Sequence, residues 1–128
     1  MRVDGHSRAW QVDDLQGLVE TLAWRDDRGG AILWLTPNDA RYPAMALRIS
    51  GGVADVHYFP REGHPGFRCM GGGLPTGGMT RLVYQGADPA TGEDTPNEFV
   101  LPVEQAAAVA VEFFRSQQMS ATVSWFEL

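Results

Sequence analysis

The spacing of hydrophobic residues predicts two helices, one near each end of the chain. The first is predicted between Asp13 and Arg25, where apolar residues recur every three or four positions. Its apolar face is formed by Leu15, Leu18, Val19, Leu22 and Ala23. Asp13 or Asp14 is suited to cap its start, and Gly29-Gly30 to end it. A second helix is predicted after Pro102, with an apolar stripe of Ala106, Val109, Ala110, Phe113 and Phe114.

Between the helices, the chain alternates between apolar and polar positions as strands do. Residues 31–35 form an apolar run, and residues 45–49 and 53–59 alternate on either side of a predicted tight turn at Ser50-Gly51-Gly52. In the strand 53–59, one side carries Val53, Asp55, His57 and Phe59, and the other carries Ala54, Val56 and Tyr58. Further strands are predicted at 67–70, 80–85 and 121–126, with a glycine-rich connection at 71–78 and an acidic loop at 86–97.

This order of elements predicts the fold class. Strands that follow one another through short turns form an antiparallel meander, and two amphipathic helices can cover one face of it. We therefore expect an α+β fold: an antiparallel β-meander sheet with two amphipathic helices packed on one face and a C-terminal strand. Residues 1–128 are enough for a single domain with its own core.

Composition and charge narrow the classes of function. Sixteen acidic residues face ten arginines and no lysine, which gives a formal net charge of -6. This balance argues against a nucleic acid as the main ligand and is compatible with a basic protein partner. The single cysteine, Cys69, fits a reducing compartment, and no apolar run is long enough for a signal peptide or a membrane span. We expect a cytoplasmic protein with no membrane partner.

Candidate chemistry is sparse in this sequence. The glycine run 71–78 lacks the lysine and the following helix of a phosphate-binding loop. His57 and His64 do not have the spacing of a common metal site, and Cys69 has the surroundings of a buried structural thiol. We expect no catalytic residues, no metal and no cofactor, and hence a protein that is not an enzyme.

The residue types that remain point to a binding surface. Aromatic residues and arginine are enriched at interface hot spots, and they gather at the end of the strand 53–59 and in the loop after it. Acidic residues follow in the loop 86–97. The predicted partner-binding residues are Asp55, His57, Tyr58, Arg61, Glu62, His64, Asp88, Glu93 and Asp94.

Three segments of the C-terminal third form a recognisable pattern. Residues 99–107 (Phe-Val-Leu-Pro-Val-Glu-Gln-Ala-Ala) lead into Val-Glu-Phe-Phe at 111–114, and Val-Ser-Trp-Phe-Glu-Leu follows at 123–128. This pattern resembles an immunity-protein family of bacterial polymorphic toxin systems. Phe113 and Trp125 match the family's most characteristic positions, and we expect both to pack in the core rather than to touch a toxin. The acidic stretch 86–97 departs from the family pattern. Members typically sit beside toxins with a nucleic-acid deaminase domain, and the family offers no catalytic residues.

The resemblance implies a protein that binds a cognate toxin, a nucleic-acid deaminase, and occludes its active site. One alternative is a small-ligand-binding domain or an unrecognised enzyme that uses His57, His64 and Arg61. Another is a structural subunit or homo-oligomer formed through an exposed strand edge.

Overall fold

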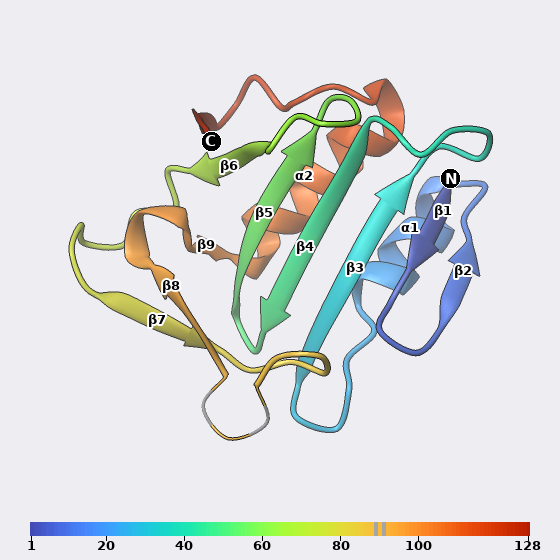
Figure 1. Ribbon diagram of the computed structural model, residues 1–128. Helices are drawn as coiled ribbons and strands as arrows, with labels where there is room; N and C mark the ends of the chain where they lie inside the picture. The colour runs from blue at the N-terminus through green and yellow to red at the C-terminus, as the bar shows by residue number, and fades with distance from the viewer. Residues whose placement is uncertain (89, 91) are drawn as a thin grey trace.

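The computed structural model describes residues 1–88, 90 and 92–128, and most of their strands join one antiparallel sheet. Its strands are β1 (Arg2–Asp4), β2 (Ala9–Gln11), β3 (Gly30–Thr36), β4 (Ala44–Ser50), β5 (Val53–Phe59), β6 (Phe67–Met70), β9 (Leu101–Pro102) and β10 (Ser124–Glu127). They run in the order β10-β6-β5-β4-β3-β1-β2, and β9 pairs with β5 off this path. A separate hairpin of β7 (Met79–Leu82) and β8 (Glu93–Pro96) projects from one side (Figure 1).

Two helices, α1 (Leu15–Leu22) and α2 (Val103–Ser116), lie behind the sheet as seen in Figure 1. The Asp14 side chain caps α1 by accepting a hydrogen bond from the Gly17 N–H at 2.8 Å. Helix α2 ends at Ser116, and the capping residue Gln117 has a left-handed backbone (φ 58°) and donates its N–H to the Phe113 carbonyl. Within the described residues, neither helix has the length and apolar character needed to cross a membrane.

The core fills the space between these helices and the sheet. Leu33, Leu47 and Val56 are register partners on three adjacent strands, and each is at most 1% exposed. Phe113 of α2 packs edge-on against Tyr58 and is fully buried. Trp125 is half-buried against the same tyrosine, so both characteristic positions pack on the core. The expected α+β architecture, with both helices on one face of an antiparallel meander, is confirmed.

Several predicted boundaries needed correction. The first helix is shorter than 13–25, because the Trp24 N–H already bonds the Thr21 carbonyl in a tighter turn. Strands β1 and β2 were not predicted, since three residues each are too few to show a period. The stretch 86–97 is not all loop: residues 93–96 form β8, and a 3-10 turn, Asn97–Phe99, follows. Residues 89 and 91 of that predicted loop lie outside the described residues.

The ends of two other strands also shifted. The strand predicted at 80–85 is β7 at 79–82, because the chain leaves its β8 partner after Leu82. The strand predicted at 121–126 is β10 at 124–127, where pairing with β6 begins at Ser124. The strands predicted at 53–59 and 67–70 have those bounds.

Candidate binding site on the open face of the sheet

The face of the sheet turned toward the viewer in Figure 1 carries neither α1 nor α2. At its β6–β10 edge the 3-10 turn Asn97–Phe99 packs on it, with the Arg68 guanidinium 4.2 Å from the Phe99 ring centroid and the Phe126 ring 5.8 Å from the same ring. Register partners in a sheet share a face, so the pairing identifies its residues. One row crosses the whole sheet through Asp4, Trp34, Ala46, His57, Arg68 and Phe126. A second row joins Ile32, Arg48 and Asp55. We call this surface the open face.

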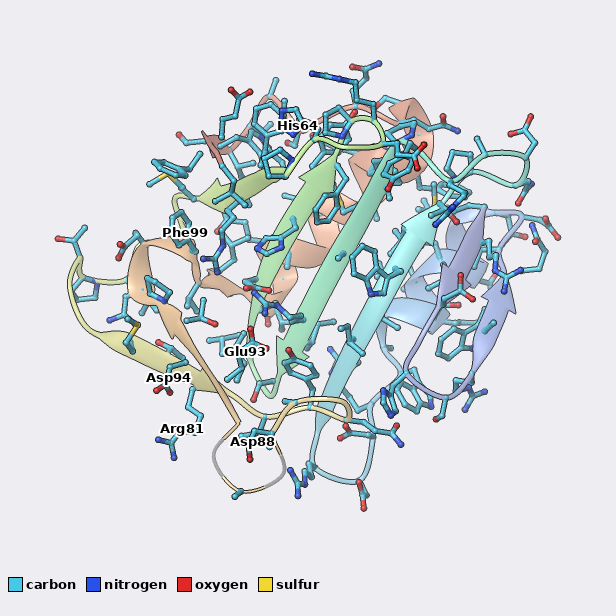
Figure 2. All side chains as sticks on the ribbon, viewed as in Figure 1. His64, Arg81, Asp88, Glu93, Asp94 and Phe99 are labelled. Carbon is cyan, nitrogen blue, oxygen red and sulfur yellow. The ribbon has the colours of Figure 1, made fainter. Side chains whose placement is uncertain are left out.

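A network of ion pairs occupies one end of the open face. Arg48 holds Asp55 with two hydrogen bonds, one from Nε at 2.8 Å and one from Nη2, and Arg68 Nη2 donates to the same carboxylate at 3.1 Å. The Asp55 side chain is only 2% exposed. Glu93 comes from β8 and accepts hydrogen bonds from Arg48 Nη1 and from the Tyr84 hydroxyl. Figure 2 shows Glu93 over the ends of β4 and β5, so this contact attaches the hairpin to the sheet.

The network shifts the pKa values of Arg48, Glu93 and Tyr84. Burial works against the charge of Arg48, but Asp55 and Glu93 outweigh it and raise the pKa of that guanidinium above its ordinary value. Burial would raise the pKa of Glu93, yet the Tyr84 hydroxyl and Arg48 lower it overall. Burial and the hydrogen bond to Glu93 raise the pKa of Tyr84 to about 12. Arg48 and Glu93 therefore carry opposite charges at neutral pH, and the Tyr84 hydroxyl stays a neutral donor to Glu93.

His57 lies beside this network without joining it. Its Nε2 atom and the Nε atom of its register partner Arg68 are both buried and have no hydrogen-bond partner among the described residues. Burial is the main cause that lowers the pKa of His57 to about 4. The positive charges of Arg48 and Arg68 also lower this pKa, whereas the negative charge of Asp55 raises it. His57 is thus a neutral side chain at pH 7.

An aromatic pair lies at the other end of the open face. The rings of Trp34 on β3 and Phe59 on β5 stack with centroids 5.6 Å apart and planes at 26°. Strand β4 lies between β3 and β5, which are therefore about 10 Å apart. The Trp34 and Phe59 side chains lean toward each other across β4. Small residues in β4 make this possible: Ala44 and Ala46 are 4% and 5% exposed. Trp34 remains 40% exposed.

Next to this pair the surface is hollowed. A depression of about 610 Å³ is lined by Trp34, Phe59, the β1 residues Arg2 and Asp4, and the loop 37–42 between β3 and β4. The Arg2 guanidinium is engaged with Asp4, with its Nε 2.9 and 3.0 Å from the two carboxylate oxygens. The open face therefore carries a largely buried ion-pair network at one end, and an exposed aromatic pair beside a hollow at the other.

The structure brings some predicted contact residues to this face. Asp55, His57 and Glu93 meet there, as the alternation along β5 indicated for the first two. Tyr58 does not: its ring is 7% exposed on the helix-covered side, and its hydroxyl donates to the Gln117 carbonyl at 3.2 Å. Because that ring belongs to the core, we remove Tyr58 from the predicted contact surface.

The other predicted contact residues lie around the edges. Arg61 and Glu62 are exposed in the turn after β5. His64 follows them, stacks on Phe67 with centroids 5.0 Å apart and lies 3.5 Å from a Glu127 carboxylate oxygen through Nε2. Figure 2 places Asp88 in the loop before β8 and Asp94 on the outer side of the hairpin. These residues do not form one site with Asp55.

Three residues of the open face were missed by sequence reasoning. Trp34 sits in the continuous apolar run 31–35, where no alternation marks one residue as outward-facing. Arg48 does alternate with Met45, Leu47 and Ile49, so its position on the open face was visible in the pattern. Arg68 lies in a four-residue strand and carried no signal until its pairing with His57 was known.

The structure does not bring the histidines or Cys69 together into a catalytic or metal site within the described residues. His64 stacks on Phe67, the register partner of Tyr58, so it lies on the opposite side of the sheet from His57. In the described part of the chain, no group of three or more His, Cys, Asp or Glu residues is arranged to hold a metal ion. Cys69 is fully buried, and burial raises the pKa of its thiol to about 12. The side chains on the open face are suited to hydrogen bonding, ion pairing and stacking.

The sequence matches no protein-family model, and no curated protein matches it either.

Proposed function

We propose that this chain is a cytoplasmic immunity protein that binds a cognate bacterial toxin, a nucleic-acid deaminase, and blocks access to its active site. On this proposal the protein is a binding partner and not an enzyme. The observation that carries the proposal is the open face, where the 40% exposed Trp34 lies beside a hollow of about 610 Å³. Exposed tryptophan next to a concave surface is typical of protein interfaces.

The ion-pair network supports a rigid binding surface. Asp55 accepts two hydrogen bonds from Arg48 and one from Arg68, and Arg48 donates a further one to Glu93, so these side chains lose little freedom when a partner covers them. Together with Glu93 these groups are two cations and two carboxylates, so desolvation of this part of the face leaves no unpaired ion. A surface prepared in this way favours tight association.

The distribution of charge supports a basic partner. Residues 86–128 hold seven acids and only Arg115 as a base, whereas the rest of the chain holds nine acids and nine arginines. The whole net charge of -6 therefore arises in the C-terminal third, which includes the hairpin strand β8 beside the open face. A deaminase must admit a nucleic-acid strand, so the entrance to its active site is expected to be positive. Opposite charges would steer and select such a pair.

Co-expression with the toxin-like domain encoded beside this protein tests the proposal. We expect a stable one-to-one complex that abolishes toxicity. Ile32→Glu places a new charge on the open face, in the row that joins Ile32 to Arg48 and Asp55, and should weaken the complex at least tenfold. Val19→Glu is the matched control, because Val19 is 53% exposed on α1, behind the sheet. It should leave affinity unchanged.

The outcomes separate the proposal from its alternatives. Absence of both complex and protection would overturn the immunity function. Equal losses from Ile32→Glu and Val19→Glu, with thermal stability intact in both, would show that the open face is not the interface. A self-association of the isolated protein that competes with toxin would instead favour a homo-oligomer through the same surface.

A further inference from the structure

We propose that the hollow beside Trp34 is an anchor site for an arginine side chain of the protein partner. The identity of that partner rests on the proposed function, since the arginine would belong to the toxin. The chemistry of the hollow itself is a property of this chain and can be tested without the toxin.

The shape of the hollow fits a long side chain with a flat end. Its volume of about 610 Å³ exceeds that of any single side chain, so a guanidinium and the stem that carries it can both enter. Trp34 and Phe59 form an aromatic wall, and the loop 37–42 forms the opposite rim. Phe59 already stacks on Trp34, which fixes the indole ring in place. A flat group entering the hollow thus meets a rigid aromatic surface.

The charged side chains in the hollow balance one another, so the aromatic wall decides between a cation and an anion. Asp4 is already engaged by Arg2, whereas Asp39 and Arg41 are exposed and have no charged partner within the described ranges. These two residues would favour opposite ligands and nearly cancel. The indole face carries negative π density, which attracts cations and repels anions.

Arginine fits this site better than lysine. Its planar guanidinium can stack on the Trp34 ring and still direct N–H groups toward a carboxylate at the rim. Asp39 offers that carboxylate from the loop. Lysine would provide a point charge without the flat surface, so we expect it to bind more weakly.

The first experiment uses N-acetyl-arginine amide as the probe and follows it by NMR on the labelled protein. We expect shifts at the Trp34 indole N–H and at the Asp39 and Ala40 amides, with the indole signals of Trp10, Trp24 and Trp125 unchanged. N-acetyl-citrulline amide has nearly the same shape without the charge and should shift these signals at least threefold less. Equal shifts with citrulline, stronger binding of N-acetyl-glutamate amide, or no local shift would overturn the inference.

A pair of rim variants tests the role of charge. Asp39→Asn removes the unpaired carboxylate and should weaken arginine-amide binding about fivefold. Arg41→Gln removes the neighbouring positive charge and should leave binding equal or stronger. Both side chains are exposed, so neither change should affect folding. Loss of binding in Arg41→Gln with none in Asp39→Asn would overturn the assignment of a cationic ligand.

The same variants applied to the toxin complex distinguish the two proposals. Trp34→Leu should weaken toxin binding about thirtyfold and Asp39→Asn about fivefold, while Arg41→Gln should not weaken it. A toxin that binds the wild-type protein but ignores Trp34 and Asp39 would overturn the anchor site and leave the immunity function standing. A protein that takes the arginine probe but no toxin would overturn the immunity function and leave the cation site standing.

Discussion

The two faces of the central sheet are built by the same strands and have opposite characters. On the helix-covered face, Leu33, Leu47 and Val56 are at most 1% exposed and touch apolar neighbours. On the open face, Trp34 is 40% exposed and Asp55 is buried by two arginines instead of by apolar groups. Alternation along a strand thus lets one sequence segment serve two purposes. Stability is expected to depend most on the first face and recognition on the second.

The largest effect is expected from a cavity on the helix-covered face. Phe113→Ala removes a fully buried ring that packs on Tyr58, and such changes cost about 3 to 5 kcal/mol of unfolding free energy. Because small domains are stable by only about 5 to 15 kcal/mol, the urea midpoint should fall sharply. The matched control is Phe114→Ala, a half-buried neighbour in the same helix that should cost clearly less. Equal losses would show that the core is not centred on Phe113.

The open face also contributes stability where charges are buried. Asp55→Asn removes the carboxylate shared by Arg48 and Arg68 and should cost about 3 kcal/mol, because two guanidinium groups lose their common partner. Urea unfolding measures this loss. The same change in an Arg68→Met background should cost less, since one cation fewer is left uncompensated. A loss below about 0.5 kcal/mol in the wild-type background would show that the network is only a surface feature.

The contrast between the faces also explains what could be predicted from the sequence. The strand 53–59 showed its alternation directly, and the structure places Asp55 and His57 on the side opposite Val56 as predicted. The apolar run 31–35 showed no alternation, because Trp34 is hydrophobic and yet faces outward. A hydrophobic side chain on a recognition surface is indistinguishable, in one sequence, from a core residue.

Contacts between segments that are distant in the sequence could not be predicted, for a different reason. The hollow joins β1, β3 and the loop 37–42, and the ion-pair network joins Arg48 to Glu93, which are 45 residues apart. Only the register of the sheet and the return of the hairpin bring these groups together. Residue type and local spacing indicate which side chains can bind a partner, but they do not indicate which of them meet.

A smaller, pH-dependent effect is expected from His57. Its pKa in the folded protein is about 4, below its ordinary value of 6.5, so the unfolded chain takes up the proton first. The stability that comes from keeping this side chain neutral is complete above pH 6.5 and is lost as the pH falls toward 4. We expect His57 to account for about 2 kcal/mol of the loss over this range.

His57→Leu is the variant that isolates this contribution. Urea unfolding at pH 7 and at pH 4.5 should show a smaller acid-induced loss in the variant than in the wild-type protein. Tyr84 and Arg48 lower the pKa of Glu93, so the contribution of Glu93 to the unfolding free energy is lost at lower pH. This loss occurs in both proteins and therefore cancels in the comparison. Identical pH profiles would mean that His57 is solvated and titrates normally in the folded state.

The smallest effect on stability is expected at the exposed ion pair of the hairpin. Arg81 Nε and the Asp94 carboxylate are 3.5 Å apart, and both side chains are 60% exposed, so Asp94→Asn should change the unfolding free energy by less than about 0.5 kcal/mol. Figure 2 shows this pair on the outer side of the hairpin, away from the network around Glu93. If the hairpin adjoins the interface, the same variant should slow toxin association at low salt and leave dissociation unchanged.

The control for this last prediction is Glu112→Gln on α2, which removes one negative charge from the helix-covered side. A reduced association rate in Asp94→Asn alone would place the hairpin beside the bound partner. Equal reductions in both variants would show that only the net charge of -6 guides the encounter. The comparison between the faces would then hold for contact but not for long-range attraction. At low salt the Debye length reaches about 30 Å, which is comparable with the size of the domain, so the attraction depends little on which side of the sheet a charge occupies.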